Sequence, residues 1–281
     1  MSSGMWIYEH KNWPNFTWDI KVLAAKLADI RYRQGCLLGQ MKSLGFELKR
    51  EASLVTLTQD IVKSSAIEGE NLNPEEVRSS IARRLGIDIA GVTPAAKRDV
   101  EGIVEMMLDA TQQFAKPLTK ERLFDWHASL FPTGRSAMRR IIVGNWRTLD
   151  NGPMQVISGP IGREKVHFEA PAADKLEKEM QKFLTWFDNE NEIDPVIKAG
   201  IAHFWFVTIH PFEDGNGRIA RAIGDMALSR GDGTENRFYS LSSQIEFERK
   251  DYYDQLERRQ RGSLVITDWL EWFLNCLGRA I

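Results

Sequence analysis

The twelve residues 210–221, HPFEDGNGRIAR, gather side chains that together could handle a polyphosphate. A histidine titrates near neutral pH, so His210 could act as a general base that takes a proton from a hydroxyl group. Asp214 offers the hard oxygen ligand that Mg²⁺ accepts beside substrate phosphates. Arg218 and Arg221 lie three residues apart, so both project from one side of a helical turn and could bind phosphate oxygens.

The backbone around these side chains predicts an anion-binding turn. His210 precedes a proline, which disfavours helical geometry, so the apolar helix predicted at 195–209 should end there. A glycine-containing turn, Gly215-Asn216-Gly217, then leads into a new helix, whose free N–H groups favour an anion. Taken singly, such a turn, a histidine at a helix end and an arginine pair are usually structural. Their order and proximity favour a catalytic site.

The segment resembles the core motif of the Fic family, H-x-F-x-(D/E)-G-N-G-R-x-x-R, at every specified position. This resemblance implies a protein adenylyltransferase, in which a Ser, Thr or Tyr hydroxyl of a target protein attacks the α-phosphorus of ATP and pyrophosphate leaves. It implies that His210 is the general base and that Asp214 holds Mg²⁺. Nucleotide binding is expected from the rest of the motif, with Phe212 fixing the loop: Phe212, Gly215, Asn216, Gly217, Arg218 and, chiefly at the γ-phosphate, Arg221.

A second motif occupies residues 64–69, SSAIEG, at the end of a predicted helix. Ser64 and Glu68 are four residues apart and share one helix face, and Gly69 is suited to ending the helix. The helix dipole disfavours a carboxylate in the last turn, so Glu68 should have a cationic partner, although a polar helix end is common without any function. The segment resembles the Fic inhibitory motif, (S/T)-x-x-x-E-(G/N), which implies that Glu68 pairs with Arg221 and blocks the γ-phosphate.

Two adjacent tyrosines, Tyr252 and Tyr253, could stack on adenine or hydrogen-bond to it. In similar proteins this region lines the base pocket, but two neighbouring residues of a helix cannot both face one ligand, so one is expected in the core. His203 lies on the apolar helix and is also expected in the core. The sequence suggests no partner for His10, His127 or His167.

Helical periodicity dominates the chain and predicts a mostly α fold: a Fic-type helical core, one small β-hairpin and an N-terminal helical region. The hairpin arms are expected at 154–158 and 165–168, where the Fic family carries a flap for its substrate. A capping box of Ser243 and Glu246 predicts a helix through Leu256. The other helices are expected at 17–44, 49–67, 73–85, Thr93 towards 114, Thr119–Leu130, 172–188, 195–209, 216–230 and from a Thr267 cap onward.

Two regions are expected: residues 1–90, an N-terminal helical region with the inhibitory motif, and residues 91–281, the Fic catalytic domain. The formal net charge is −2 and no basic stripe is visible, so nucleic acid is not an expected partner. No apolar stretch approaches the ~20 residues that span a bilayer, and the start has no signal peptide pattern. The expected location is cytoplasmic. The expected partners are a target protein, the chain itself through self-modification, and a second copy in a homodimer.

Two alternatives remain open from the sequence. Fic relatives also transfer other phosphate-linked groups, and some remove AMP with help from the inhibitory glutamate. The chain could instead be a nucleotide-sensing regulator whose slow chemistry is incidental.

Overall fold

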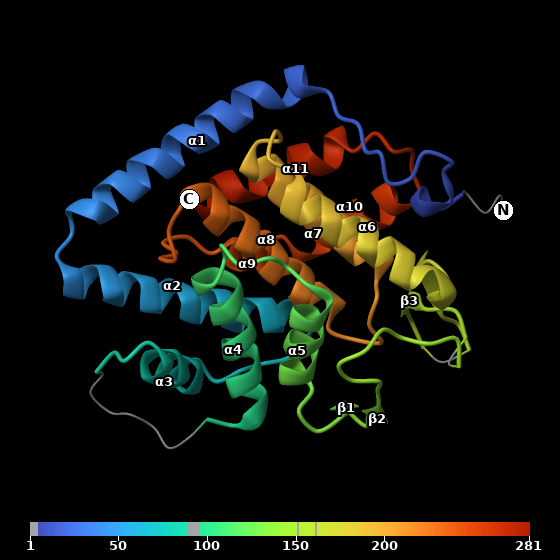
Figure 1. Ribbon diagram of the computed structural model, residues 1–281, viewed down its shortest axis with the longest axis horizontal. Coiled ribbons are helices and arrows are strands. Elements are labelled where there is room, and N and C mark those ends of the chain that lie inside the picture. Colours follow the sequence, from blue (N-terminus) through green and yellow to red (C-terminus); the bar gives the residue numbers. More distant parts are fainter. Residues whose placement is uncertain (1–4, 89–95, 151, 161) are drawn as a thin grey trace.

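The computed structural model describes all residues except 1–4, 89–95, 151 and 161, and this part of the chain is mostly helical, as predicted. Figure 1 shows two long N-terminal helices flanking a central group of helices. The chain opens with a 3₁₀ turn, η1 (Ile7–Glu9). The helices that follow before the first strand are α1 (Ile20–Ser43), α2 (Phe46–Ile67), α3 (Pro74–Arg84), α4 (Arg98–Gln112) and α5 (Lys120–Leu130).

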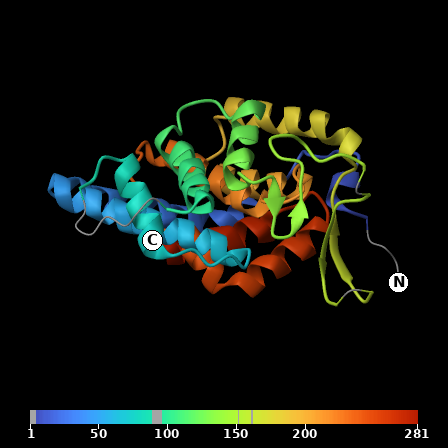
Figure 2. The same ribbon diagram turned by 90° about the horizontal axis from the view of Figure 1, so that it is seen from below.

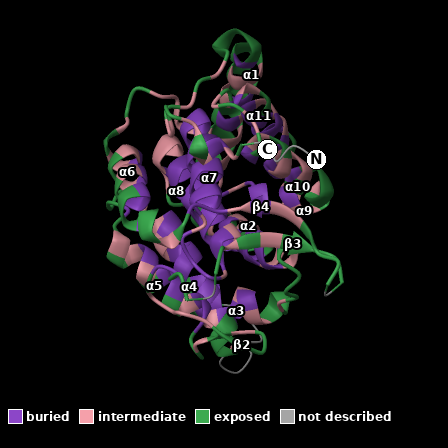
Figure 3. Ribbon diagram, turned by 90° about the vertical axis from the view of Figure 1, so that its right-hand side faces the viewer, coloured by how far each residue is buried: buried purple, intermediate pink, exposed green. Residues whose placement is uncertain are grey.

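The second half holds a 3₁₀ turn, η2 (Ala173–Lys175), and six more helices. These are α6 (Leu176–Asn189), α7 (Pro195–Ile209), α8 (Asn216–Asp232), α9 (Leu241–Phe247), α10 (Arg249–Gln260) and α11 (Thr267–Ala280). Helix α7 forms the centre of the core, because its side chains from Val196 to Ile209 are all buried. It packs against α6, α8 and α11, and Figure 3 shows α7 and α8 as the most continuously buried ribbons. The residue after this helix is therefore placed by a rigid support.

Capping residues confirm several predicted helix starts. The Asn73 side chain accepts a hydrogen bond from the Glu75 N–H at the start of α3, with proline in the first turn. The Thr119 side chain accepts from the Arg122 N–H and begins α5. The Asp194 side chain accepts from the Val196 N–H, so α7 begins at Pro195 as its sequence predicts.

The predicted hairpin is present as β3 (Gln155–Ser158), paired antiparallel with β4 (Lys165–Glu169). Val156 lies opposite Phe168, whereas the next residue, Ile157, lies opposite Val166. His167 is therefore an additional residue in β4, at a β-bulge. Figure 2 shows this hairpin projecting at one end of the molecule. A second, very short hairpin, β1 (Arg135–Ser136) with β2 (Arg139–Arg140), was not predicted.

Two predicted helix starts are wrong. Ser240, not Ser243, caps α9, and the Ser240 hydroxyl accepts the Ser243 N–H. The expected single helix through Leu256 is interrupted at Glu248 and divided into α9 and α10. Thr267 is the first residue of α11 rather than its cap, and its hydroxyl instead accepts the Asp19 N–H. In both cases a neighbouring residue takes the cap position because of contacts with other parts of the fold. The helix start expected at Thr93 and the domain boundary expected at 90 and 91 lie outside the described residues.

None of the helices in the described part of the chain combines the length and apolar character needed to cross a membrane.

Candidate active site

His210 follows α7 directly and has left-handed backbone angles, φ 52° and ψ 58°. This conformation is costly for a residue with a Cβ, so the surroundings must hold it. The His210 N–H donates to the Phe206 carbonyl at 3.0 Å. The buried Arg147 donates from Nε to the His210 carbonyl at 2.8 Å, and its own N–H donates to the Pro211 carbonyl at 2.9 Å. Arg147 thus fixes the backbone on which the imidazole is mounted.

The ring of His210 is oriented for proton acceptance. Its Nδ1 lies 3.1 Å from the Val207 carbonyl, which can only accept, so Nδ1 carries the hydrogen and Nε2 is the free base. Burial lowers the pKa of His210 to about 4, a shift that the nearby Arg147 reinforces. The imidazole is therefore neutral at physiological pH, the form that a general base requires.

The loop between α7 and α8 is closed by a reciprocal pair of bonds. The Phe212 N–H donates to Asn216 Oδ1 at 2.9 Å, and Asn216 Nδ2 donates to the Phe212 carbonyl at 2.8 Å. The Phe212 ring is fully buried and stacks on His127, 4.2 Å between centroids. Phe212, which the sequence placed among the nucleotide contacts, thus lies inside the core and can act only by fixing the loop. Gly215 has φ 78°, and a Cβ there would lie 2.9 Å from the Phe131 ring.

Asp214 lines the pocket beside this loop. Its carboxylate accepts the Gly215 N–H at 2.6 Å and a hydrogen bond from the Ser136 hydroxyl. No cluster of three or more metal-binding side chains occurs among the described residues. A single carboxylate does fit Mg²⁺, which takes most of its remaining ligands from water and substrate phosphates.

Arg221 and Glu68 form the ion pair that the resemblance implied. Arg221 Nη2 donates to Glu68 Oε1 at 2.8 Å, and the Arg221 side chain is almost fully buried. Arg221 also donates from Nε to the Ser64 hydroxyl at 2.9 Å and from Nη2 to the Ser64 carbonyl at 2.8 Å. Glu68 is the C-cap of α2, and Gly69 follows with φ 85°, the left-handed conformation that ends many helices.

Gly217 shows where the Glu68 carboxylate lies. A Cβ at Gly217 would come within 2.1 Å of Glu68 Oε1, so the carboxylate lies against the backbone of the first turn of α8. Free N–H groups and the helix dipole make this position attractive to an anion. The protein's own carboxylate therefore occupies the place where a phosphate would be favoured.

Arg218, the second arginine of the motif, is also buried and paired. Its Nη1 donates to Glu70 Oε2 at 2.6 Å, and its guanidinium lies over the Phe131 ring. Burial raises the pKa of Glu70, although the charge of Arg218 acts in the opposite direction. Glu70 was not predicted as a site residue from the sequence. A carboxylate two residues after Glu68 was the available signal.

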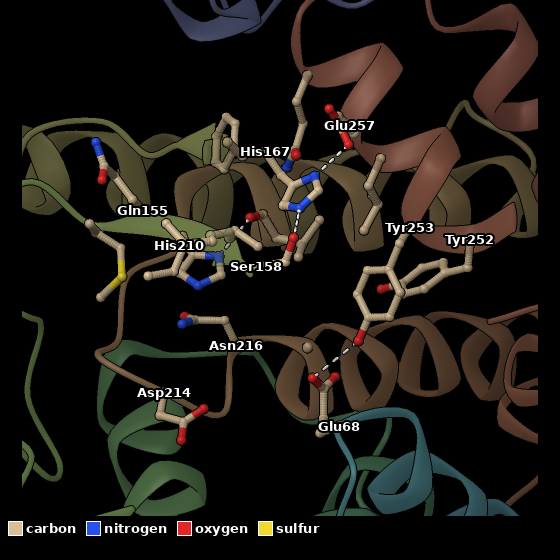
Figure 4. Close-up of a pocket in the computed structure, with 18 of the residues that line it drawn as sticks. Glu68, Gln155, Ser158, His167, His210, Asp214, Asn216, Tyr252, Tyr253 and Glu257 are labelled. Carbon is tan, nitrogen blue, oxygen red and sulfur yellow. Dashed lines mark hydrogen bonds and ion pairs between the residues drawn. The ribbon is translucent and has the colours of Figure 1, made fainter. Parts of the chain in front are cut away.

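Glu68, His210 and the loop residues 213–217 line one cavity of about 540 Å³. Figure 4 shows His210, Asp214 and Asn216 at one end and Glu68 below Tyr253 at the other. The hydroxyl of Tyr253 donates to the Ile67 carbonyl at 3.2 Å and approaches Glu68 Oε2 at 3.4 Å. Tyr252 also contributes to the wall, but its hydroxyl is bound to the fully buried His203 at 2.9 Å. The predicted core position of His203 is confirmed.

The hairpin β3–β4 and helix α10 form the remaining wall, which carries a group of side chains that was not predicted from the sequence. Ser158, His167 and Glu257 are joined by hydrogen bonds there. His167 and Glu257 are 90 residues apart, so no spacing pattern could have indicated them.

Comparison with known proteins identifies the central part of this fold. Residues 117–228 match the Fic/DOC family, and residues 6–87 match a domain of unknown function, DUF4172. The chain therefore contains a Fic/DOC family domain, as its motif predicted. A crystal structure of a Fic family protein from Desulfovibrio desulfuricans superimposes with a TM-score of 0.68, at 25% identity over 95% of this chain and 74% of that one.

Curated relatives carry the name protein adenylyltransferase. The Caenorhabditis elegans protein adenylyltransferase fic-1 is 28% identical over 59% of this chain and 30% of its own length. The Nematostella vectensis protein adenylyltransferase Fic is 25% identical over 79% of this chain and 47% of its own length. The matched regions thus span less than half of these relatives.

Proposed function

We propose that the chain is a protein adenylyltransferase that transfers AMP from ATP to a Ser, Thr or Tyr hydroxyl of a target protein. The observation that carries the proposal is one pocket that combines a neutral, correctly oriented His210 with Asp214 and the N-terminus of α8. The names of the curated relatives support the same class of reaction. ATP would be the nucleotide substrate, and the catalytic domain would span 91–281.

Each residue has a role in this reaction. Nε2 of His210 accepts the proton of the target hydroxyl while its oxygen attacks the α-phosphorus and the bond to pyrophosphate breaks. Asp214 would hold Mg²⁺, which would neutralise phosphate charge when bound. Gly215 and Gly217 present the backbone of the turn, and Asn216 keeps that turn closed. Arg218 and Arg221 bind the outer phosphates once their carboxylate partners leave.

The proposal includes restraint by the region 1–90. The Glu68 carboxylate binds Arg221 and lies against the first turn of α8, so ATP must displace this carboxylate before its γ-phosphate can bind. Tyr253, whose hydroxyl contacts Glu68, would lie beside the adenine, and Tyr252 would support it from the core. Self-modification is the expected first activity, in a cytoplasmic protein that acts alone or as a homodimer.

The experiment compares ATP labelled at the α-phosphate with ATP labelled at the γ-phosphate, using Glu68→Gly to remove the restraint. Label from the α position on protein, with pyrophosphate release, is expected. Label from the γ position would indicate a kinase, and label from neither would indicate a nucleotide sensor. Release of AMP from pre-modified protein, without net transfer, would indicate the reverse activity.

A further inference from the structure

Ser158, His167 and Glu257 form a continuous row of hydrogen bonds on the pocket wall. The Ser158 Oγ lies 2.6 Å from His167 Nε2, and His167 Nδ1 lies 2.5 Å from Glu257 Oε2. Figure 4 shows this row on one side of the pocket and Glu68 with Asp214 on the other. A hydroxyl, an imidazole and a carboxylate in this order are the arrangement that activates a serine as a nucleophile.

The protonation pattern follows from the partners. An ionised carboxylate can only accept, so His167 Nδ1 carries a hydrogen and Nε2 accepts from the Ser158 hydroxyl. Burial would raise the pKa of Glu257, but its hydrogen bonds from His167 and Lys165 outweigh burial and lower that pKa. Glu257 is therefore in the charged form that can stabilise an imidazolium.

The backbone gives a second, independent indication that these side chains form a site. His167 is the additional residue of the β-bulge in β4, and a bulge redirects one side chain out of the regular alternation. Ser158 is the last residue of β3 and is exposed, so a substrate can approach it from solvent. Both residues line the same cavity as His210 and Asp214.

We propose that Ser158 is an AMP acceptor within the chain, with His167 as its general base and Glu257 as the group that orients that base. The inference rests on the proposed adenylyltransferase function. The Ser158 oxygen forms a bond to the α-phosphorus of ATP, and the bond from that phosphorus to the β-phosphate oxygen breaks. The hydroxyl proton passes to His167 Nε2, and pyrophosphate leaves with the electron pair. His210 then serves hydroxyls that enter from other proteins.

A purely structural role would be a brace that ties the hairpin to α10. Lys165 already provides such a tie, since its Nζ lies 2.9 Å from Glu257 Oε1. A brace needs hydrogen bonds but no proton acceptor. His167→Gln separates the two roles, because glutamine retains hydrogen-bonding capacity and cannot take the proton.

The experiment incubates the full chain carrying Glu68→Gly with ATP and Mg²⁺, maps the adducts by fragmentation mass spectrometry and measures pyrophosphate release. AMP on Ser158 is expected. It should be absent in Ser158→Ala, slowed by ~10² in His167→Gln and slowed at least about tenfold in Glu257→Gln. Ser263→Ala, at an exposed serine whose hydroxyl accepts the Val265 N–H, is the matched control and should retain the adduct.

The outcomes separate the two proposals. AMP on other residues but not on Ser158, with pyrophosphate released, overturns the assignment of Ser158 and leaves the adenylyltransferase function standing. An unchanged rate at Ser158 in His167→Gln overturns the role of His167. No pyrophosphate and no adduct anywhere overturns the adenylyltransferase function together with this inference. Titration calorimetry with a non-hydrolysable ATP analogue checks that His167→Gln still binds nucleotide, which ties a slower rate to proton transfer.

Discussion

Glu68 and Arg221 are 153 residues apart in the sequence, and their side chains meet at 2.8 Å beside the first turn of α8. Arg221 is about 1% exposed and Glu68 about 30% exposed, so the pair is largely shielded from water. Such a shielded, charge-assisted contact is stronger than a surface ion pair. It joins the segment 6–87, which matches DUF4172, to the segment 117–228, which matches the Fic/DOC family.

Glu68→Gly should raise the rate of AMP transfer. A charge-assisted hydrogen bond contributes about 1.5–3 kcal/mol, which corresponds to a roughly ten- to hundredfold increase when ATP no longer competes with it. The readout is α-labelled AMP on the chain itself. Glu68→Gln is the matched variant and should be intermediate, because it retains size without charge. Arg221→Ala should be inactive in both backgrounds; a Glu68→Gly protein no faster than wild type would refute the restraint.

Glu70→Gln should produce a smaller activation. The contact with Arg218 is short, but the Glu70 side chain is 49% exposed and solvent weakens the pair. A half-exposed pair contributes at most about 1 kcal/mol, so the expected increase in transfer is about two- to fivefold. In a double variant with Glu68→Gly, the two increases in transfer rate should multiply if each carboxylate blocks a different arginine. A double variant no faster than Glu68→Gly would show that Glu70 does not compete with phosphate.

His210→Ala should bind ATP·Mg²⁺ nearly as well as wild type while losing transfer by ~10² or more. Arg147→Met should share this pattern in weaker form, because it removes the side-chain hydrogen bonds to the His210 and Pro171 carbonyls and keeps the backbone bond to Pro211. Calorimetry measures binding, and single-turnover labelling of hydroxyls other than that of Ser158 measures transfer. Equal losses of binding and rate in His210→Ala would indicate a structural histidine.

The free edge of β3 should pair with an extended segment of the target. The Ala170 N–H donates to the Met154 carbonyl, so the antiparallel alternation turns the Gln155 N–H away from β4. Gln155→Pro removes that outward donor, and an edge strand tolerates proline. Transfer to a protein target should fall while ATP binding persists. Gln155→Ala, which retains the N–H, is the control, and equal behaviour of the two variants would place target docking elsewhere.

Buried histidines should make the fold sensitive to mild acid. Burial lowers the pKa of His127 to about 4, so between about pH 6.5 and pH 4 the unfolded chain binds a proton that the folded chain does not. Stability should therefore fall as pH falls through this range. At pH 5 the loss through His127 is about 2 kcal/mol relative to pH 7. Urea unfolding of His127→Gln should show a smaller decrease in the free energy of unfolding between pH 7 and pH 5 than the wild type. An identical pH dependence of stability in both proteins would exclude a contribution from His127.

The correct sequence predictions rest on patterns within short segments of the chain. Helix α7 was predicted because its cap, its proline and the proline after His210 all lie within the segment. The β3–β4 arms followed from alternation between turn residues. The division between α9 and α10 was not predictable in this way, because Ser240 and Ser243 are both good caps and Asp60 of α2 binds Ser240.

The missed parts of the site depend on contacts between distant segments. Arg147 contacts His210 from an irregular stretch between β2 and β3, and Glu70 contacts Arg218 from the segment that follows α2. The row of Ser158, His167 and Glu257 needs a β-bulge, which appears only once the register of the two strands is known. Only a folded chain reveals such groups.

The anchoring of Arg221 by Ser64 has a kinetic consequence. Two bonds to Ser64 hold the guanidinium in place whether or not Glu68 contacts it. Breaking the contact between Glu68 and Arg221 therefore requires only a rotation of the partly exposed Glu68 side chain, and α2 does not have to unfold. Such rotations take picoseconds to nanoseconds, far faster than enzyme turnover. Progress curves of the wild-type protein should accordingly be linear from the first turnover, with a reduced slope and no lag.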